Sequence, residues 1–263
     1  MSAIERLRYM RKKEFEMVFR DIDIPPHLRI LEIGCGDGFQ SSLLRRYSNY
    51  VVSTDLTTER TLNLDIVCDA EYLPFKNGLF DIVYSSNVLE HIRDRDTGLS
   101  EMKRILSDDG FGIIMVPTSA WKVLSLLAYY PVMGCYVINA IKKKLMNKNN
   151  SKISGNSKIN TSIRRPRDYL KFLLPGVHGE YQNSIEEFNA FRISSWKRLL
   201  RANGLEIIKT KKTLLYSPPE FPIVPAVDLS KLGICSTVAF ISKVQRTDKG
   251  ATSAAFMNPE KGC

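Results

Sequence analysis

Cysteine and histidine are both scarce in this sequence, which has five cysteines and three histidines among 263 residues. Structural zinc sites and disulfide frameworks need clustered or paired cysteines. Here no two cysteines are spaced as C-x-x-C, and they are scattered at Cys35, Cys68, Cys135, Cys235 and Cys263. Neither kind of site is predicted, no metal is expected, and a reducing, cytoplasmic location is favoured.

The N-terminal segment lacks the long apolar run of a signal peptide. Residues 1–27 instead mix charged and apolar side chains in the pattern of an amphipathic helix. We expect this helix to pack beside a ligand cleft. A chain of 263 residues is long enough for one large α/β unit with additions.

The most informative segment is residues 30–44, ILEIGCGDGFQSSLL, an apolar strand that leads into three glycines at alternate positions. Gly34, Gly36 and Gly38 permit a tight turn and let a ligand approach the backbone. The helix that follows presents unpaired N–H groups to that ligand. A dinucleotide fingerprint needs a glycine where this chain has Phe39, which disfavours NAD.

Three acidic residues extend this nucleotide-binding pattern. Glu32 stands at the end of the first strand, where its carboxylate favours a cationic amino-acid group over a pyrophosphate. Asp55 ends the β-branched run VVSTD and can accept both ribose hydroxyls. Asp69 follows another apolar stretch, 64–68, and can accept a hydrogen bond from an adenine amino group. The ligand that fits this set is S-adenosylmethionine.

Together with FDIVYSSNVLEH at 80–91, these segments resemble the class I S-adenosylmethionine-dependent methyltransferases, specifically the type 11 small-molecule group related to the ubiquinone and menaquinone methyltransferases. The resemblance covers residues 28–118 and implies S-adenosylmethionine as the cofactor. It implies that the first motif holds the methionine part, the acid after the second strand binds ribose, and the Asp-Ala pair meets adenine. The residues assigned to the cofactor are Glu32, Gly34, Cys35, Gly36, Gly38, Asp55, Leu56, Asp69, Ala70, Ser86 and Asn87.

Alternating strand and helix patterns predict a doubly wound, seven-stranded, mostly parallel sheet of the Rossmann-like methyltransferase type, with an insertion after the fifth strand. The strands are expected near 28–33, 50–54, 64–68, 80–85, 111–116, 205–215 and 236–244. The expected divisions are an N-terminal helix (1–27), a cofactor-binding core (28–118), the insertion (119–191), the rest of the sheet (192–246) and a flexible tail (247–263).

The insertion is expected to select the substrate. Its stretch 123–141 carries no charge, and Lys142, Lys143 and Lys144 follow it. Helices covering the active site, a monotopic membrane anchor and a membrane span all remain open for 123–141. The low-complexity stretch 147–162 is expected to be a disordered loop. Its basic residues suit either a solvated loop or attraction to anionic lipid headgroups, and we expect peripheral association with the inner face of a membrane.

If the methyl acceptor is a hydroxyl, a base is needed, and His91 and His178 are the candidates, because His27 lies before the first strand. Either one can instead be a locally hydrogen-bonded structural residue. The polar residues of 172–188 are candidates for acceptor contact, namely His178, Glu180, Tyr181 and Asn183. This stretch and 233–244 are similar to methyltransferases from bacterial polysaccharide gene clusters, which implies a sugar or lipid-linked glycan as the acceptor.

Some acceptors are disfavoured by what is missing after the fourth strand. Enzymes that methylate nucleobase amino groups carry Asp/Asn-Pro-Pro-aromatic there, and cytosine-ring enzymes carry Pro-Cys, whereas this chain has Ser85, Ser86, Asn87 and Val88. An RNA methyltransferase stays open on the net charge of +10 alone, although no RNA-binding module is evident. A quinone or lipid methyltransferase and a non-catalytic partner protein with this fold also stay open.

Overall fold

The computed structural model describes residues 2–59, 64–150, 177–218 and 225–245. These residues form a seven-stranded sheet with the strand order β3-β2-β1-β4-β5-β7-β6. Neighbouring strands from β3 to β5 are parallel, and β7 runs antiparallel to both β5 and β6. The strands are β1 (Arg29–Ile33), β2 (Tyr50–Asp55), β3 (Ile66–Val67), β4 (Phe80–Ser86), β5 (Leu106–Pro117), β6 (Leu205–Lys212) and β7 (Thr237–Val244). The predicted fold class is confirmed.

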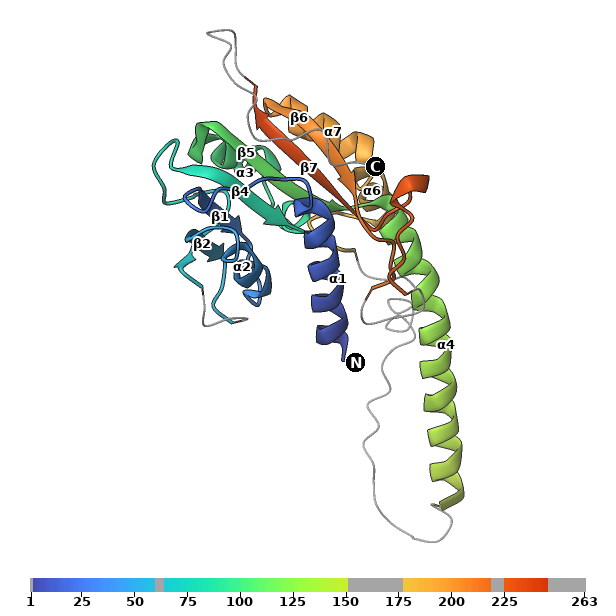
Figure 1. Ribbon diagram of the computed structural model, residues 1–263. Helices are drawn as coiled ribbons and strands as arrows, with labels where there is room; N and C mark the ends of the chain where they lie inside the picture. The colour runs from blue at the N-terminus through green and yellow to red at the C-terminus, as the bar shows by residue number, and fades with distance from the viewer. Residues whose placement is uncertain (1, 60–63, 151–176, 219–224, 246–263) are drawn as a thin grey trace.

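Helices connect the strands and cover the sheet on both faces (Figure 1). The α-helices are α1 (Ala3–Phe19), α2 (Phe39–Leu44), α3 (Arg95–Ile105), α4 (Ser119–Asn150), α6 (Ser184–Ala190) and α7 (Ile193–Ala202). Two short 3₁₀ helices are η1 (Leu89–His91) and η2 (Ser230–Leu232). The N-terminal helix that residues 1–27 predict is α1.

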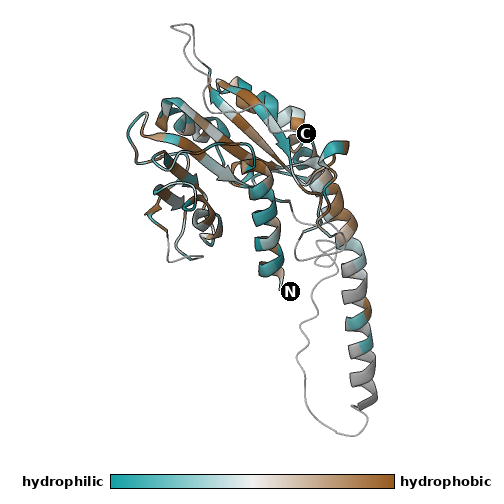
Figure 2. Cartoon of the chain, in the orientation of Figure 1, coloured by the Kyte–Doolittle hydropathy of each residue, from teal (hydrophilic) through white to brown (hydrophobic). Residues whose placement is uncertain are grey.

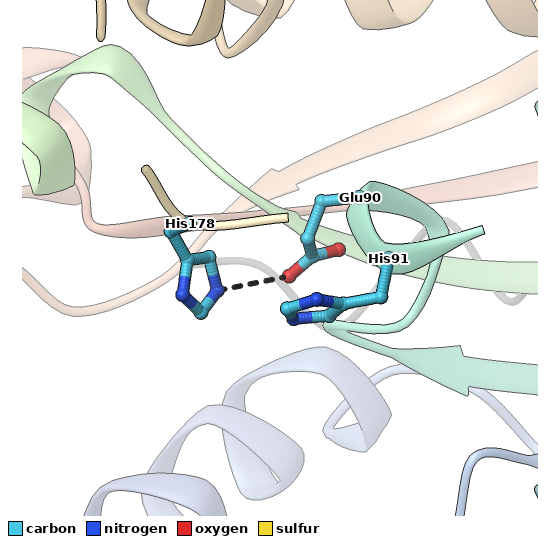
Figure 3. Close-up of side chains that lie close together, drawn as sticks. All are labelled: Glu90, His91 and His178. Atoms are coloured by element: carbon cyan, nitrogen blue, oxygen red, sulfur yellow. Dashed lines mark ion pairs between the residues drawn. The ribbon is translucent and has the colours of Figure 1, made fainter. Parts of the chain in front are cut away.

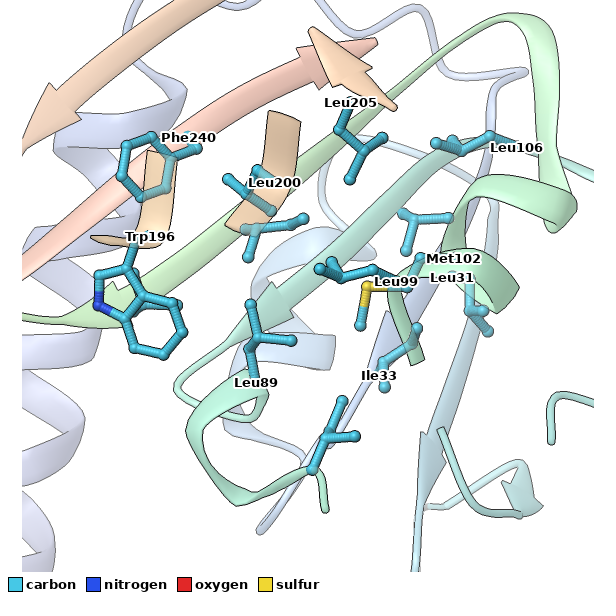
Figure 4. Packing of buried hydrophobic residues seen from close by; sticks show 14 of the residues in the cluster. Leu31, Ile33, Leu89, Leu99, Met102, Leu106, Trp196, Leu200, Leu205 and Phe240 are labelled. Carbon is cyan, nitrogen blue, oxygen red and sulfur yellow. The ribbon is translucent and has the colours of Figure 1, made fainter. Parts of the chain in front are cut away.

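The central strands are apolar because both of their faces are buried. Along β1, Ile30 points into a core with Phe15 and Phe19 of α1. Its neighbour Leu31 points into the opposite core, which is closed by α3 and α7. Figure 4 shows this second core, and Figure 2 shows hydrophobic residues along the strands of the sheet.

The run SSWKRLLRANG predicts a helix that ends at Gly204, and α7 does end beside this glycine. Trp196 and Leu200 are buried on one face, and the Trp196 Nε1 donates a hydrogen bond to the Pro117 carbonyl at 2.9 Å. Gly204 follows the helix with a φ of 73°, a conformation that glycine adopts without steric cost. The end of β5 is thereby fixed against α7.

Two of the parallel strands differ from the predicted ranges by more than one residue, and the strand expected at 205–215 ends at Lys212. The strand expected at 64–68 is only two residues long, and the Asp65 carboxylate beside it accepts from the Ser53 N–H at 2.7 Å. The strand expected at 111–116 is longer, since β5 begins at Leu106 directly after α3. None of these differences changes the sheet order.

The apolar stretch 123–141 lies within the single helix α4, which extends beyond the rest of the described chain (Figure 1). Near the start of α4 Lys122 is buried against Glu187 of α6, with Nζ and Oε2 2.5 Å apart. No helix among the described residues is both long and apolar enough to cross a membrane. Of the predicted loop 147–162, residues 147–150 end α4. The remainder, like the predicted tail 247–263, lies outside the described residues.

Candidate active site

The turn after β1 is shaped by its three glycines. Gly34, Gly36 and Gly38 have φ angles of 74°, 56° and 73°. A Cβ at Gly34 would overlap the Val88 side chain, so only glycine lets the turn approach the loop after β4. A Cβ at Gly36 would meet nothing within 4 Å, so the turn is open at this point.

The end of β2 holds the same turn in place. The Asp55 carboxylate accepts hydrogen bonds from the Gly36 N–H at 2.8 Å and from the Leu56 N–H at 2.7 Å. Cys35 donates its N–H to the Thr54 carbonyl at 2.9 Å, and burial raises the pKa of its thiol to about 12. Leu56 is exposed beside Asp55 and offers an apolar surface.

Glu32 lies deeper than the sequence suggests. Its side chain is 2% exposed and accepts a hydrogen bond from the Ser41 hydroxyl of α2. Burial raises the pKa of this carboxyl to about 7, despite the opposing effect of the Ser41 hydrogen bond. The acid of the first motif is therefore a buried, easily protonated group beneath the glycine turn.

The structure brings Asp69 and Ala70 to the neighbouring edge of the same region. The Cys68 N–H donates to the Asp55 carbonyl at 3.0 Å, which places the 68–70 turn beside the end of β2. The Asp69 side chain is exposed, and its Oδ1 accepts from the Glu71 N–H at 2.9 Å. Its other carboxylate oxygen thus faces away from this local turn bond.

Ser86 ends β4, and Asn87 follows it in a strained conformation. Asn87 has a φ of 56°, and no other described residue except glycine has a positive φ. Its N–H donates to the Met115 carbonyl at 2.9 Å. With the amide oriented to satisfy its neighbours, its Oδ1 accepts from the Arg11 guanidinium of α1.

Arg11 belongs to a buried polar cluster that sequence reasoning missed. Its Nη1 donates to Glu14 Oε2 at 3.1 Å, and the Glu14 side chain is fully buried. The other Glu14 oxygen accepts from Thr213 and Tyr216 at 2.9 and 3.1 Å. An Arg and a Glu three residues apart normally indicate an exposed helical pair. No local sequence pattern indicates that this pair joins α1 to the end of the sheet.

A second group of side chains gathers where the loop after β4 meets the insertion. The rings of His91 and His178 are 4.7 Å apart, and Trp121 of α4 lies 4.9 Å from His178. The His178 Nε2 is 3.8 Å from Glu90 Oε1, and Figure 3 shows the three polar side chains converging. Both predicted histidines thus lie in one place, together with Glu90 and Trp121, which the sequence did not single out.

The end of the insertion is bound tightly to the loop after β4. Gly179 has a φ of 87°, and a Cβ there would overlap the Glu90 carbonyl. That carbonyl accepts from the Glu180 N–H at 3.0 Å and from Arg95 Nη2 at 3.2 Å. The Arg95 guanidinium also lies over the Tyr181 ring at 4.5 Å. These contacts fix His178 beside Glu90.

The remaining predicted residues have more local surroundings. Asn183 caps α6 by accepting from the Ile185 and Glu186 N–H groups, and the Glu180 side chain is exposed. The Tyr181 hydroxyl is buried without a partner among the described residues, and burial raises its pKa to about 12. His27 lies before β1, at the opposite edge of the sheet from the glycine turn.

Comparisons with known proteins agree with this geometry. Residues 31–114 match the family described as a methyltransferase domain. The chain is 29% identical over 136 residues to a ubiquinone biosynthesis O-methyltransferase of Bartonella quintana, with 46% of this chain and 55% of that protein covered. It is 34% identical over 95 residues to a malonyl-[acyl-carrier protein] O-methyltransferase of Geobacter sulfurreducens, with 31% and 36% covered.

Residues 31–114 form a methyltransferase domain. A solved geranyl diphosphate C-methyltransferase of Streptomyces coelicolor shares its fold, with a TM-score of 0.51 and 12% identity over 92% of this chain and 83% of that one. That structure contains S-adenosyl-L-homocysteine. The chain spans about half the length of the curated relatives it matches.

The described residues fit S-adenosylmethionine, the cofactor of this methyltransferase domain. The turn is open at Gly36, where backbone can meet the ligand, and the Asp55 carboxylate is fixed at its side by two backbone N–H groups. Leu56 leaves an apolar face exposed next to it. The Asp55 carboxylate and the apolar Leu56 side chain are thus adjacent, as a ribose next to an adenine requires.

Glu32 makes the stability of the methyltransferase domain pH-dependent. Its folded pKa of about 7 exceeds the ordinary value of 4.5, so the folded state holds a proton that the unfolded state releases between these values. The free energy of unfolding should therefore fall as pH rises through this window, by up to about 1.4 kcal/mol per unit. Urea unfolding of wild type and Glu32→Gln without cofactor measures this effect. Profiles of the free energy of unfolding against pH that run parallel in wild type and Glu32→Gln would contradict this prediction. The control is Glu16→Gln, which changes an exposed carboxylate of α1.

Proposed function

We propose that this protein transfers a methyl group from S-adenosylmethionine to a hydroxyl oxygen of a saccharide or lipid-linked glycan. The observation that carries the proposal is the short loop from Asn87 to His91. Asn87 follows β4 beside the glycine turn, where Val88 contacts Gly34. Three residues later the same loop supplies Glu90 and His91 to the group around His178. The loop therefore joins a cofactor site to a site suited to an acceptor.

The residues proposed to hold the cofactor surround the glycine turn. Asp55 would accept the ribose hydroxyls, and Asp69 with Ala70 would meet the adenine beside Leu56. Glu32 and the turn glycines would hold the methionine part, with Cys35, Ser86 and Asn87 completing the wall. When bound, S-adenosylmethionine supplies a methyl group that is already activated on a sulfonium.

The protein's own work is to align the acceptor, exclude water and activate the hydroxyl. A hydroxyl is a poor nucleophile until its proton leaves, and we assign its activation to His91 and His178. The fixed loop that carries His178 also carries Tyr181, whose ring is held by Arg95. His178 and Tyr181 are therefore the leading acceptor contacts, ahead of Asn183 and Glu180.

An oxygen acceptor is supported by the relatives, two of which are named O-methyltransferases. The saccharide part rests on the similarity of 172–188 and 233–244 to polysaccharide-cluster methyltransferases. A quinone-type lipid is the second candidate, because one relative acts in ubiquinone biosynthesis and α4 exposes apolar side chains. On this helix Val123, Leu127, Tyr130 and Ile138 are between 41% and 62% exposed.

We also propose that α4 rests on an anionic membrane surface. Exposed apolar side chains of α4 precede Lys142, Lys143 and Lys144, and apolar residues next to basic ones favour the interface of an anionic bilayer. Such placement would bring the domain to a lipid-linked acceptor.

Replacing Asp55 by Ala should abolish cofactor binding, because its carboxylate is the proposed acceptor of the ribose hydroxyls. Two backbone N–H groups hold this carboxylate at the turn. S-adenosylmethionine at a hundredfold over its Kd should stabilise wild type by roughly 2.7 kcal/mol and leave Asp55→Ala unshifted. Thermal unfolding with and without the cofactor measures this. An equal shift in both proteins would remove Asp55 from the site, and no shift in wild type would contradict the cofactor proposal.

Replacing either histidine by Gln should lower methyl transfer by about 10²-fold or more while the cofactor-induced thermal shift persists. Transfer of a labelled methyl group to glycan, quinone-precursor and RNA fractions identifies the acceptor, with label expected in the glycan fraction. The matched control is His27→Gln, which lies at the far edge of the sheet and should keep wild-type turnover. Unchanged turnover in a variant would eliminate that histidine, and label in quinone precursors or RNA would contradict the saccharide proposal.

Sedimentation with vesicles tests the membrane proposal. The protein should pellet with anionic vesicles at low salt and stay in solution with neutral ones. Replacing Lys142, Lys143 and Lys144 by Gln should weaken vesicle binding by roughly two orders of magnitude, at about 1 kcal/mol per residue. A control variant that loses the same charge elsewhere, Lys12→Gln/Lys76→Gln/Lys197→Gln, should pellet like wild type. A wild-type protein that stays in the supernatant rules the proposal out.

A further inference from the structure

Glu90, His91 and His178 present three metal-ligand groups to one point. One ligand atom from each lies within 4.8 Å of the other two (Figure 3). Glu90 and His91 come from the end of η1, and His178 comes from the loop that ends the insertion. The expectation that no metal binds rested on cysteine spacing, which gives no information about a carboxylate and two imidazoles from distant segments.

The carboxylate of Glu90 has charged groups near it, His178 Nε2 at 3.8 Å and the Arg11 guanidinium, but its oxygens accept no hydrogen bond from the described residues. Its side chain is 0% exposed. Arg95 does not serve it, because this guanidinium donates to the backbone carbonyls of Leu89, Glu90 and Glu180. A buried carboxylate without hydrogen bonds destabilises the folded state. A cation placed between Glu90 and the two imidazoles removes that destabilisation.

We infer that Glu90, His91 and His178 bind one divalent transition-metal ion. Two imidazoles and one carboxylate suit zinc, iron or manganese better than magnesium, which prefers oxygen ligands. Zinc bonds of about 2.0–2.2 Å bring ligand atoms closer together than 4.8 Å, so binding requires these side chains to move toward one another. Three protein ligands leave a position for water or for an acceptor oxygen.

His178 is already fixed for this role by its surroundings. Gly179 allows the backbone to lie against the Glu90 carbonyl, and Arg95 binds both this carbonyl and Glu180. Trp121 packs against the imidazole on another side. His178 therefore joins Glu90 and His91 of η1 as a metal ligand without a backbone rearrangement.

The chemical consequence rests on the proposed function, although metal binding itself does not. A hydroxyl bound to the ion becomes more acidic, as metal-bound water does. Its proton can then pass to solvent water, and the oxygen lone pair would attack the methyl carbon while the sulfur–methyl bond breaks and S-adenosylhomocysteine leaves. His91 and His178 would activate the acceptor by holding the ion.

Calorimetric titration of the untagged, chelator-treated full chain with Zn²⁺ tests the inference. Wild type should bind one ion, and Glu90→Gln, His91→Gln and His178→Gln should each weaken binding at least tenfold. The control His27→Gln changes the third histidine, which lies at the opposite edge of the sheet, and should bind like wild type. Co²⁺ in place of Zn²⁺ should give a visible absorption band in wild type that His178→Gln loses.

Absence of binding in wild type, or equal affinity in all variants, would overturn the inference. If circular dichroism shows that Glu90→Gln does not fold, the metal affinity of His178→Gln tests the inference instead, because His178 is half-exposed. The cofactor-induced thermal shift is recorded on the same proteins. Zinc binding without this shift in wild type contradicts the proposed function and leaves the metal site standing, whereas the shift without zinc binding contradicts the metal site alone.

Discussion

Burial of the central parallel strands on both faces is the constraint on which the rest of this structure depends. Because β1, β4 and β5 run in the same direction, their carboxyl ends meet at one edge. Two apolar cores hold them there, one closed by α1 and α2 and the other by α3 and α7. Three segments leave from that edge, namely the glycine turn, the loop after β4 and the start of α4. Their polar groups therefore converge there, and the apolar cores, not long-range polar contacts, fold the sheet.

The insertion is joined to this edge by few but specific contacts. The Glu90 carbonyl accepts two hydrogen bonds from residues that secure the His178 loop, and Gly179 supplies the space. On the other side the buried Lys122–Glu187 pair ties α4 to α6. Breaking such a pair leaves an uncompensated buried charge. The Lys122–Glu187 pair therefore specifies how the two helices meet more than it stabilises the fold. The insertion is therefore joined to the sheet domain by contacts near both of its ends.

Features that are local in sequence were predictable. The glycine turn, the acids at strand ends and the end of α7 at Gly204 each depend on a few adjacent residues and the strand or helix beside them. Asn87 shows the limit, because it combines a positive φ with a hydrogen bond to Met115, a residue far away in the chain. Arg11 and Glu14 looked like a surface pair and are instead a buried link to Thr213 and Tyr216.

By itself the sequence determined the fold class and the type of cofactor, because periodicity and turn chemistry act over short distances. It also marked His91 and His178 separately. Only the tertiary structure decided that these histidines share one site with Glu90 and Trp121, that Glu32 is buried against Ser41, and that the apolar stretch 123–141 is one protruding helix. The physical reason is that these outcomes depend on packing between segments far apart in the chain, for which a single sequence carries no local signal.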